Sequence, residues 1–464
     1  MRINHLKRRR RFPFGWVILA LVVIAGIGFA ITPIRERVLA KVDSLIVEAR
    51  SVLFPVPEAA FVPQGVTMPT VTPDKSLFEP SDTPFPTAAP TNTSKPSAAT
   101  ATPSTPEPTS PPTATPTPIP SAVKLTGVKW ESQNGAWNYC GPTNLAMLLS
   151  YWGWKGDKFT TGTYLKPFQY DYNVMPYEMV NYVTDLTKLG AVWRLGGTQD
   201  ELKLLIANGF PVLVEKGVYF EETATHKLGW MGHYAVITGY DDANKQFITQ
   251  DSYVQPDLPI SYDLLDQEWR DFNFVFIVAY SPDKKDQLFS LLGPYADENT
   301  AYRIAYDRAS KEINSLSGGD QYFAWFNRGT AQVDLQDFAG AAQSYDQSFQ
   351  LLASNFSDDK RPWRMLWYQT GPYFAYFYSG RYQDVINLAT STLDYIKNRA
   401  QALGITDQPQ VGQFIEETWY WRGKARLVTG DQQDAISDYK MALKYHPGFT
   451  PAVGELKNLG VPVQ

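Results

Sequence analysis

The first apolar stretch of the 464-residue chain runs without a charged side chain from residue 14 to about residue 32. At a rise of about 1.5 Å per residue, a helix of this length nearly spans the hydrocarbon core of a bilayer, which is about 30 Å thick. Six Lys and Arg residues precede the stretch, and three follow it closely. The pattern predicts a transmembrane signal-anchor helix over residues 14–32, with a basic cytoplasmic tail at 1–13 and all later residues outside the cytoplasm.

The alternative to an anchor is a cleaved signal peptide, because "GFA" at residues 28–30 resembles a cleavage site. The apolar stretch is longer than that of most signal peptides, so we favour an uncleaved, single-pass protein of the cell membrane. Apolar spacing over residues 33–53 predicts a juxtamembrane helix that continues the anchor, since fewer than three heptads is short for a coiled coil. Residues 54–121 are rich in Pro, Thr and Ser, which predicts a disordered linker.

Helical and strand patterns alternate over residues 122–285, which predicts a folded α+β domain. Helix signals occur at 142–153, where Pro142 lies in the first turn, at 176–190, and at 198–209, where Thr198 and Glu201 could form a capping box. Four later runs rich in β-branched and aromatic residues predict one largely antiparallel sheet. These runs are "FPVLVEKG", "HYAVITGYDD", "KQFITQDSY" and "FNFVFIVAY".

Residues 297–464 contain an internal repeat. Two copies, which begin at Trp325 and Trp419, share small and aromatic residues at matching positions, and a looser copy lies in "YFAYFYSGRYQDVINLATSTL". The matching pairs are Gly329/Gly423, Ala341/Ala435 and Tyr345/Tyr439. The copies resemble the tetratricopeptide repeat, although their intervals exceed its usual length of about 34 residues. The resemblance implies an all-α helical repeat domain that binds a protein partner or substrate. The connection before it has helical periodicity and little Pro or Gly, so we expect the repeats to pack on the α+β domain.

Charge and composition exclude several classes of function. The formal net charge is -5, yet nine of the 42 Lys and Arg residues and only one of the 47 acidic residues lie within residues 1–41. The rest of the chain is therefore strongly acidic, and we expect no nucleic-acid partner. Neither a phosphate-binding glycine loop nor a metal-ligand cluster is apparent, so we expect no cofactor and no metal. Asp241 and Asp242 are interpreted as turn residues.

The chain has one cysteine, Cys140, directly before the helical-looking run "GPTNLAMLLSYWG". A single thiol forms no intramolecular disulfide, so it is either a buried apolar residue or a group with a reactive role. The predicted helix start favours the reactive role, because the positive end of a helix dipole stabilises a thiolate.

A nucleophilic thiol needs a base, and the base needs a group that orients it. Of the four histidines, His5 and His446 lie outside the α+β domain, and His226 lies in a polar, loop-like segment. His233 opens a predicted strand, and Asp251 ends the next one. Adjacent strand ends bring two such residues within reach, so we predict a triad of the cysteine, His233 and Asp251.

The motifs "YCGPTNLAMLLSYWG", "GHYAVITGYDD" and "QDSY", in this order, resemble the peptidase C39-like domain, a papain-type cysteine peptidase fold. The resemblance covers about a third of the chain. It implies that Cys140, His233 and Asp251 are catalytic and that an upstream glutamine helps to form the oxyanion hole. That glutamine commonly lies six positions before the cysteine, where this chain has Asn134. Gln133 lies one position further upstream and would serve if the intervening loop bulges by one residue.

We therefore expect a multidomain, membrane-anchored extracytoplasmic thiol hydrolase, preferably a peptidase, that acts on a peptide or protein. Members of this family often process peptides within an export transporter, but this chain carries no transporter helices or nucleotide-binding motif. A catalytically silent extracellular scaffold is one alternative. An acyl or amide transferase is the other, since the same thioester chemistry serves both hydrolysis and transfer.

Overall fold

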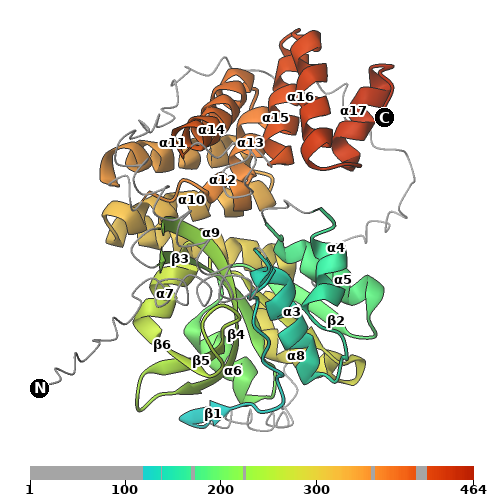
Figure 1. Cartoon of the computed structure of the whole chain (residues 1–464). Coiled ribbons are helices and arrows are strands. Elements are labelled where there is room, and N and C mark those ends of the chain that lie inside the picture. The colour runs from blue at the N-terminus through green and yellow to red at the C-terminus, as the bar shows by residue number, and fades with distance from the viewer. Residues whose placement is uncertain are drawn as a thin grey trace, which may run out of the picture. The chain divides into compact units, whose positions relative to one another are not determined.

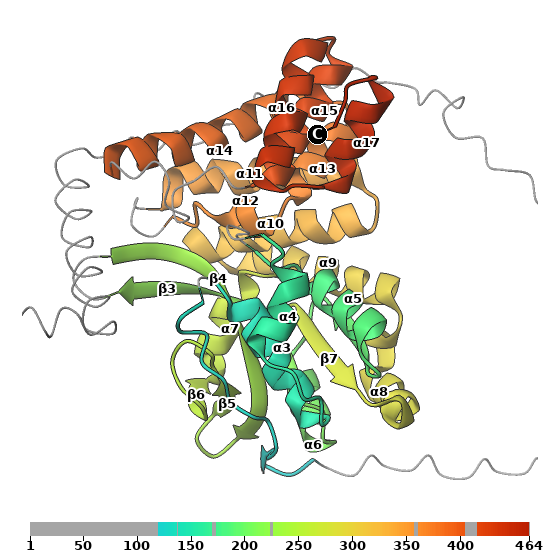
Figure 2. The same cartoon turned by 45° about the vertical axis from the view of Figure 1, so that its right-hand side comes forward.

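The structure is a computed structural model that describes residues 119–136, 138–168, 173–222, 226–356, 361–403 and 415–463 (Figures 1 and 2). The predicted cytoplasmic tail, membrane helix and juxtamembrane helix, and the predicted linker up to residue 118, lie outside the described residues. Within the described ranges, no helix is both long enough and apolar enough to cross a membrane.

The first part of the described chain is an α+β domain, as predicted, with an antiparallel sheet (green and yellow in Figure 1). The strand order is β2-β7-β3-β4-β5-β6, and β1 pairs with the C-terminal end of β4. The strands are β1 (Ala122–Lys124), β2 (Gly190–Arg194), β3 (Val212–Glu222), β4 (His226–Asp241), β5 (Gln246–Gln250), β6 (Leu258–Ser261) and β7 (Phe276–Tyr280). All neighbouring strands run antiparallel in the described part.

Helices precede the sheet in the chain and also connect its strands. They are α3 (Cys140–Tyr151), α4 (Lys158–Leu165), α5 (Pro176–Leu186), α6 (Gln199–Ala207) and α7 (Tyr262–Arg270). These helices cover both faces of the sheet. Strand β3 shows this arrangement, because successive side chains of a strand point to opposite faces. Leu213 packs in one core cluster with Leu148 of α3, whereas Val212 and Val214 pack in a second cluster with Leu205 of α6.

The structure corrects the secondary-structure prediction in several places. The helix predicted over 176–190 ends at Leu186, because Thr187 is extended and its hydroxyl donates to the Val183 carbonyl over 2.6 Å. The chain thereby enters β2, which the prediction missed together with β1, β6, α4 and α7. In the helix predicted over 198–209, which ends at Ala207, the Thr198 hydroxyl accepts the N–H of Glu201 over 3.1 Å. Thr198 is therefore the N-cap, but the predicted capping box is incomplete, because the Glu201 side chain does not accept the Thr198 N–H in return.

A helical connection follows the sheet. It consists of η2 (Pro282–Lys284), α8 (Lys285–Leu292), η3 (Gly293–Ala296) and α9 (Glu298–Ser315). It packs on the domain rather than extending from it, since Arg194 of β2 donates through Nε to the Tyr295 carbonyl over 2.6 Å. Arg308 of α9 stacks its guanidinium 3.1 Å from the ring centroid of Phe274.

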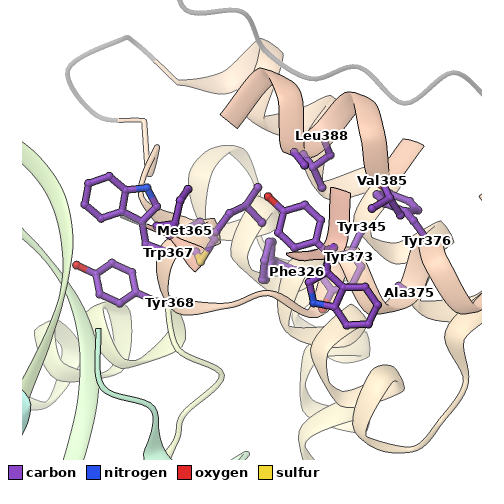
Figure 3. Close-up of a cluster of buried hydrophobic side chains, with 14 of the residues drawn as sticks. Phe326, Tyr345, Met365, Trp367, Tyr368, Tyr373, Ala375, Tyr376, Val385 and Leu388 are labelled. Carbon is purple, nitrogen blue, oxygen red and sulfur yellow. The ribbon is translucent and has the colours of Figure 1, made fainter. Parts of the chain in front are cut away.

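The C-terminal region is helical, as predicted (orange to red in Figure 1). Its helices are α10 (Gly318–Asp334), α11 (Phe338–Asn355), α12 (Met365–Tyr368), α13 (Gly371–Tyr378), α14 (Tyr382–Leu403), α15 (Glu416–Val428), α16 (Gln432–Tyr445) and α17 (Thr450–Asn458). Short turns join α10 to α11, α13 to α14 and α15 to α16. Figure 3 shows the aromatic core of the region, which includes Phe326, Tyr345, Tyr373 and Tyr376.

Two matching glycines make equivalent contacts in this region. A Cβ atom at Gly329 of α10 would lie 2.8 Å from the ring of Tyr345 in α11. A Cβ atom at Gly423 of α15 would likewise lie 2.8 Å from the ring of Tyr439 in α16. The sequence repeat therefore has a physical cause, since each helix pair approaches closely at a glycine that faces a tyrosine. The resemblance of these helices to tetratricopeptide repeats stays a prediction.

The helical region contacts the α+β domain through aromatic and polar side chains. Trp230 of β4 is fully buried, donates to Oδ2 of Asp271 over 2.6 Å, and stacks on Phe272 and on Phe323 of α10. The Asn327 amide of α10 donates to the carbonyl of Arg270 over 2.7 Å. A single apolar cluster contains residues from both regions.

Candidate active site

The only thiol of the chain lies at the start of a tightly packed helix. Cys140 is the first residue of α3 and is half-buried. The first N–H groups of a helix lack acceptors within it, and the dipole there favours negative charge. The helix start has little room to move, because a Cβ atom at Gly141 would lie 3.0 Å from Cβ of Val174 and 3.1 Å from Cε of Met179.

His233 and Asp251 meet because their strands are neighbours. His233 lies on β4, and Asp251 directly follows β5. The ladder pairs Val236 with Gln250, so the next residue, Asp251, lies beside the middle of β4, where His233 is found. The histidine does not open its strand as predicted, because pairing with β3 extends β4 back to His226. Nε2 of His233 lies 3.0 Å from both Oδ1 and Oδ2 of Asp251, and both side chains are buried.

Backbone groups also hold the Asp251 carboxylate. Its Oδ1 accepts the N–H groups of Tyr253, over 2.9 Å, and Val254, over 3.0 Å. The indole N–H of Trp130 donates to the Asp251 carbonyl over 2.9 Å, which fixes the main chain there. Burial on its own raises the pKa of this carboxyl, but the charge and hydrogen bond of His233 and the two N–H donors outweigh burial and lower it. Asp251 is therefore ionised at neutral pH.

The contact with Asp251 fixes which nitrogen of His233 faces the thiol. Because the acceptor Asp251 lies at Nε2, this nitrogen carries a proton, and Nδ1 is left for the hydrogen bond with Cys140. Burial on its own lowers the pKa of His233, but the charge of Asp251, the hydrogen bond with it and the contact with Cys140 raise the pKa to about 9. The imidazole is therefore protonated at neutral pH.

The Cys140 thiol has a lowered pKa. Burial raises this pKa, but the hydrogen bond and charge of His233, the backbone N–H of Tyr234 and the charge of Lys166 together lower it below its ordinary value. A lowered thiol pKa beside a raised imidazole pKa favours a thiolate–imidazolium pair. Such a pair contains both a nucleophile and a proton donor.

Gln133 belongs to a chain of hydrogen bonds that also includes Ser252 and Asn144. Asn144 of α3 donates to the Ser252 hydroxyl over 2.8 Å, and this hydroxyl donates to Oε1 of Gln133 over 2.7 Å. The Gln133 N–H donates to the Ser252 carbonyl over 2.9 Å. Because Oε1 is the acceptor in this chain, the amide NH₂ group of Gln133 is turned away from Ser252. The sequence prediction gave no role to Ser252 or Asn144, although Ser252 lies within the motif "QDSY" and Asn144 within "YCGPTNLAMLLSYWG".

Asn134, the alternative to Gln133, is exposed. Its backbone N–H donates to the Ser132 hydroxyl over 3.2 Å, and its carbonyl accepts from Nζ of Lys158. The loop between Gln133 and the cysteine contains two residues with positive φ, Gly135 at 83° and Asn138 at 53°. The backbone therefore turns sharply at these two residues, and the oxyanion role of Gln133 stays a prediction.

Two buried polar side chains near the thiol escaped the sequence prediction. Lys166, just after α4, is buried, and its charge acts on Cys140. Glu215 of β3 is buried opposite Tyr234, and burial raises its pKa well above the ordinary value. Nothing in the local sequence distinguishes these two residues from the many surface Lys and Glu residues, so only the fold identifies them.

The remaining candidate polar residues have other roles. His446 of the C-terminal region contacts Glu416 over 3.1 Å, and the side chain of His226 lies outside the described residues. Asp241 accepts two N–H groups in the turn after β4, and Asp242 pairs with Lys203, which agrees with their interpretation as turn residues. Among the described residues, no group of three or more His, Cys, Asp or Glu side chains could hold a metal ion.

The α+β domain matches a family of known proteins. Residues 125–274 match the Peptidase_C39 like family. This match confirms the predicted C39-like resemblance for the α+β domain and suggests a cysteine peptidase-type function. The C-terminal helices lie outside the match.

A Bacillus anthracis protein described as a C39-like peptidase was also found among the solved structures. It is 18% identical to this chain, and the alignment covers 34% of this chain and 98% of the other, with a TM-score of 0.29. No curated protein matches the chain.

Proposed function

We propose that the C39-like domain is a thiol hydrolase that cleaves peptide or protein substrates, with Cys140 as the nucleophile. The observation that supports this proposal best is the position of His233, which hydrogen-bonds the thiol on one side and lies 3.0 Å from both oxygens of Asp251 on the other. A cysteine that has only a structural role needs neither a hydrogen-bonded histidine nor an aspartate behind that histidine. The family match over residues 125–274 supports the same class of reaction.

The proposed reaction follows from these positions. The Cys140 thiolate attacks the substrate carbonyl carbon, and the carbonyl π electrons move to oxygen. The His233 imidazolium gives its Nδ1 proton to the leaving amine as the C–N bond breaks, which leaves a thioester on the cysteine. Water then loses a proton to His233 and attacks the thioester, and the thiolate departs. Asp251 keeps the proton on Nε2 and stabilises the imidazolium throughout.

The tetrahedral intermediates carry a negative oxygen that needs donors. We assign this role to the Cys140 backbone N–H at the start of α3 and to the side-chain amide of Gln133. One such donor typically lowers the barrier by about 3 to 4 kcal/mol. The hydrogen bond from Ser252 to Oε1 of Gln133 supports this assignment, because it directs the NH₂ group away from Ser252.

The direct test is cleavage of a complex peptide mixture. Purified full-length protein is incubated with a proteome-derived peptide library, and new peptide termini are identified by mass spectrometry. The proposal expects cleavage products with the wild type and none with Cys140→Ala. It also expects a thioester adduct on Cys140 at short reaction times. Products that form equally with Cys140→Ala, or an adduct on another residue, would reject Cys140 as the nucleophile.

We also propose that residues 14–32 anchor the protein in the membrane and that the folded regions face outward. The sequence pattern carries this part of the proposal. Protease added to intact cells should cut within the linker 54–121 and release a soluble fragment. Cutting only after lysis would reject the outward orientation.

The proposed role of the helical region is to bind a polypeptide partner or substrate. The tetratricopeptide-like pattern of its matching residues supports this role. If the region binds substrate, a long polypeptide should be cleaved with a higher kcat/KM than a short peptide that contains the same bond. Equal values would argue against substrate binding by these helices.

A further inference from the structure

A short helix of the C-terminal region contacts the strand that carries His233. The ring of Tyr368, the last residue of α12, packs on Gly232, the residue before His233. A Cβ atom at Gly232 would lie 3.1 Å from Cε1 of Tyr368. The same ring lies 5.9 Å from Trp230 and 5.7 Å from Phe272, measured between ring centroids. Figure 3 shows Trp367 and Tyr368 on the side of the helical core that faces the strands.

The same helix also contacts the segment that packs on the cysteine helix. Asn173 donates from Nδ2 to the carbonyl of Trp367 in α12. The next residue, Val174, has its Cβ atom 3.0 Å from where a Cβ atom at Gly141 would lie, and Gly141 directly follows the cysteine. The hydroxyl of Tyr234, the residue after the histidine, donates to the Val174 carbonyl over 2.8 Å.

Hydrogen bonds on both flanks hold α12 in this position. Arg364, before the helix, donates from Nη1 to the Trp230 carbonyl over 3.0 Å. Gln369, after the helix, donates from Nε2 to the Asp271 carbonyl over 3.0 Å. A four-residue helix held at both ends and buried along its length has little freedom of its own.

We propose that α12 is a brace that sets the distance between Cys140 and His233, with Tyr368 and Asn173 as positioning residues. The inference rests on the proposed function of Cys140 and deepens it. A thiolate–imidazolium contact weakens steeply when the two groups move apart, and they lie on different elements, α3 and β4. The brace contacts β4 directly and α3 through Asn173 and Val174, and it comes from the C-terminal region, outside the family match. The catalytic pair of this chain therefore depends on its helical region.

The test measures the rate of Cys140 alkylation by iodoacetamide from pH 4 to pH 10 in the full-length protein. Asn173→Ala removes the contact with Trp367, and Tyr368→Ala removes the contact with Gly232. Both should raise the pH midpoint by about one unit, which makes alkylation about tenfold slower at pH values below the midpoint. The titratable groups that act on the thiol are His233, Lys166, Glu215, Tyr234 and Tyr368. Asn173→Ala changes none of them, and Tyr368→Phe removes only the Tyr368 hydroxyl.

Matched controls separate positioning from general loss of stability. Asn208→Ala removes a similar amide that donates to the Leu204 carbonyl at the end of α6, and should leave the midpoint unchanged. Tyr368→Phe keeps the ring and should keep the wild-type profile. If Tyr368→Ala does not fold, Asn173→Ala and its control decide the question.

The outcomes distinguish this inference from the proposed function. A wild type that reacts at low pH, with unshifted midpoints in folded Asn173→Ala and Tyr368→Ala, rejects the brace alone. A loss of thermal stability without a shift in midpoint rejects it as well, because the contacts would then be structural only. A wild-type thiol that is unreactive below its ordinary pKa rejects the proposed function.

Discussion

Nε2 of His233 lies 3.0 Å from both carboxylate oxygens of Asp251, and both side chains are buried. The aspartate therefore acts on the histidine through its charge as well as through a hydrogen bond. Substitutions can separate the two effects, because an asparagine keeps the acceptor and loses the charge. Cysteine peptidases with a Cys-His-Asn arrangement show that an amide suffices to orient the histidine.

The first prediction concerns Asp251. Asp251→Asn should reduce kcat/KM by about tenfold or less, because an amide oxygen can still accept from Nε2. Asp251→Ala should reduce it by about 100-fold and destabilise the fold by about 3 to 5 kcal/mol, since it leaves one member of a buried pair alone. Steady-state kinetics and urea unfolding measure both effects. Asp263→Ala, an exposed acid in α7, is the control and should change neither. If Asp251→Asn and Asp251→Ala reduce kcat/KM equally, the charge and the hydrogen bond of Asp251 do not have separable effects.

The second prediction concerns stability against pH. The pKa of His233 is raised to about 9, so the folded state holds this proton more tightly than the unfolded state, where the pKa is about 6.5. Its contribution is fully present below pH 6.5 and is lost as pH rises through 9. The lowered pKa of Cys140 has the opposite slope over much of this window, because the folded state has already released the thiol proton.

Removal of the thiol should therefore leave only the decrease in stability with rising pH that His233 causes. In Cys140→Ala, the thermal unfolding midpoint should fall as pH rises above 6.5, relative to the wild type. The fall should be complete below pH 9, because the thiolate that helps to raise the histidine pKa is gone. Adding Asp251→Asn should flatten this fall, because it removes the charge that raises the histidine pKa. If the thermal unfolding midpoint falls equally in the wild type and in Cys140→Ala, the pKa of the Cys140 thiol is not lowered in the folded state.

The third prediction concerns the oxyanion donor. Gln133→Ala should lower kcat by about 100- to 1,000-fold if its amide binds the oxyanion. Asn134→Ala should have little effect, because its side chain is exposed. Ser252→Ala should lower kcat by an amount between these two, since it removes the hydrogen bond that orients the Gln133 amide. Steady-state kinetics on a peptide identified from the library provides the measurement. A larger loss in Asn134→Ala than in Gln133→Ala would reverse the assignment.

The sequence predicted those features that depend on local pattern. Helix-start signals identified the cysteine helix, and runs rich in β-branched and aromatic residues identified the buried central strands. The order of the cysteine, histidine and aspartate motifs was enough to propose the residues that the fold brings together. Motif order works here because β4 and β5 are consecutive antiparallel strands, and the end of β5 lies beside the segment of β4 that contains His233.

Features that depend on long-range packing were not predicted. Strands β1, β2 and β6 are short, and pairing with neighbouring strands stabilises them more than their own residues do. Glu215 and Lys166 become unusual only when the fold buries them. The contact between Tyr368 and Gly232 joins residues far apart in the chain, and no local signal marks it.

The fourth prediction concerns the matched glycines of the helical region. Gly329→Ala and Gly423→Ala should each destabilise the protein by about 1 to 3 kcal/mol, because the new Cβ would lie 2.8 Å from a tyrosine ring. Gly454→Ala in α17 is the control, since a Cβ there meets nothing within 4 Å. That substitution should be neutral or stabilising by up to about 1 kcal/mol. Urea unfolding that gives the same change for all three would contradict the equivalent packing of the two helix pairs.

The central claim is that Cys140 is an activated nucleophile, and its alkylation rate against pH tests this most directly. Because the chain has one cysteine, every label reports on this residue. In the native full-length protein, iodoacetamide should react well below the pKa of an ordinary thiol, about 8.5, and His233→Ala should move the midpoint upward. If the native thiol reacts only after denaturation, or with a midpoint of about 8.5 in both proteins, Cys140 is an ordinary cysteine and the proposed function is wrong.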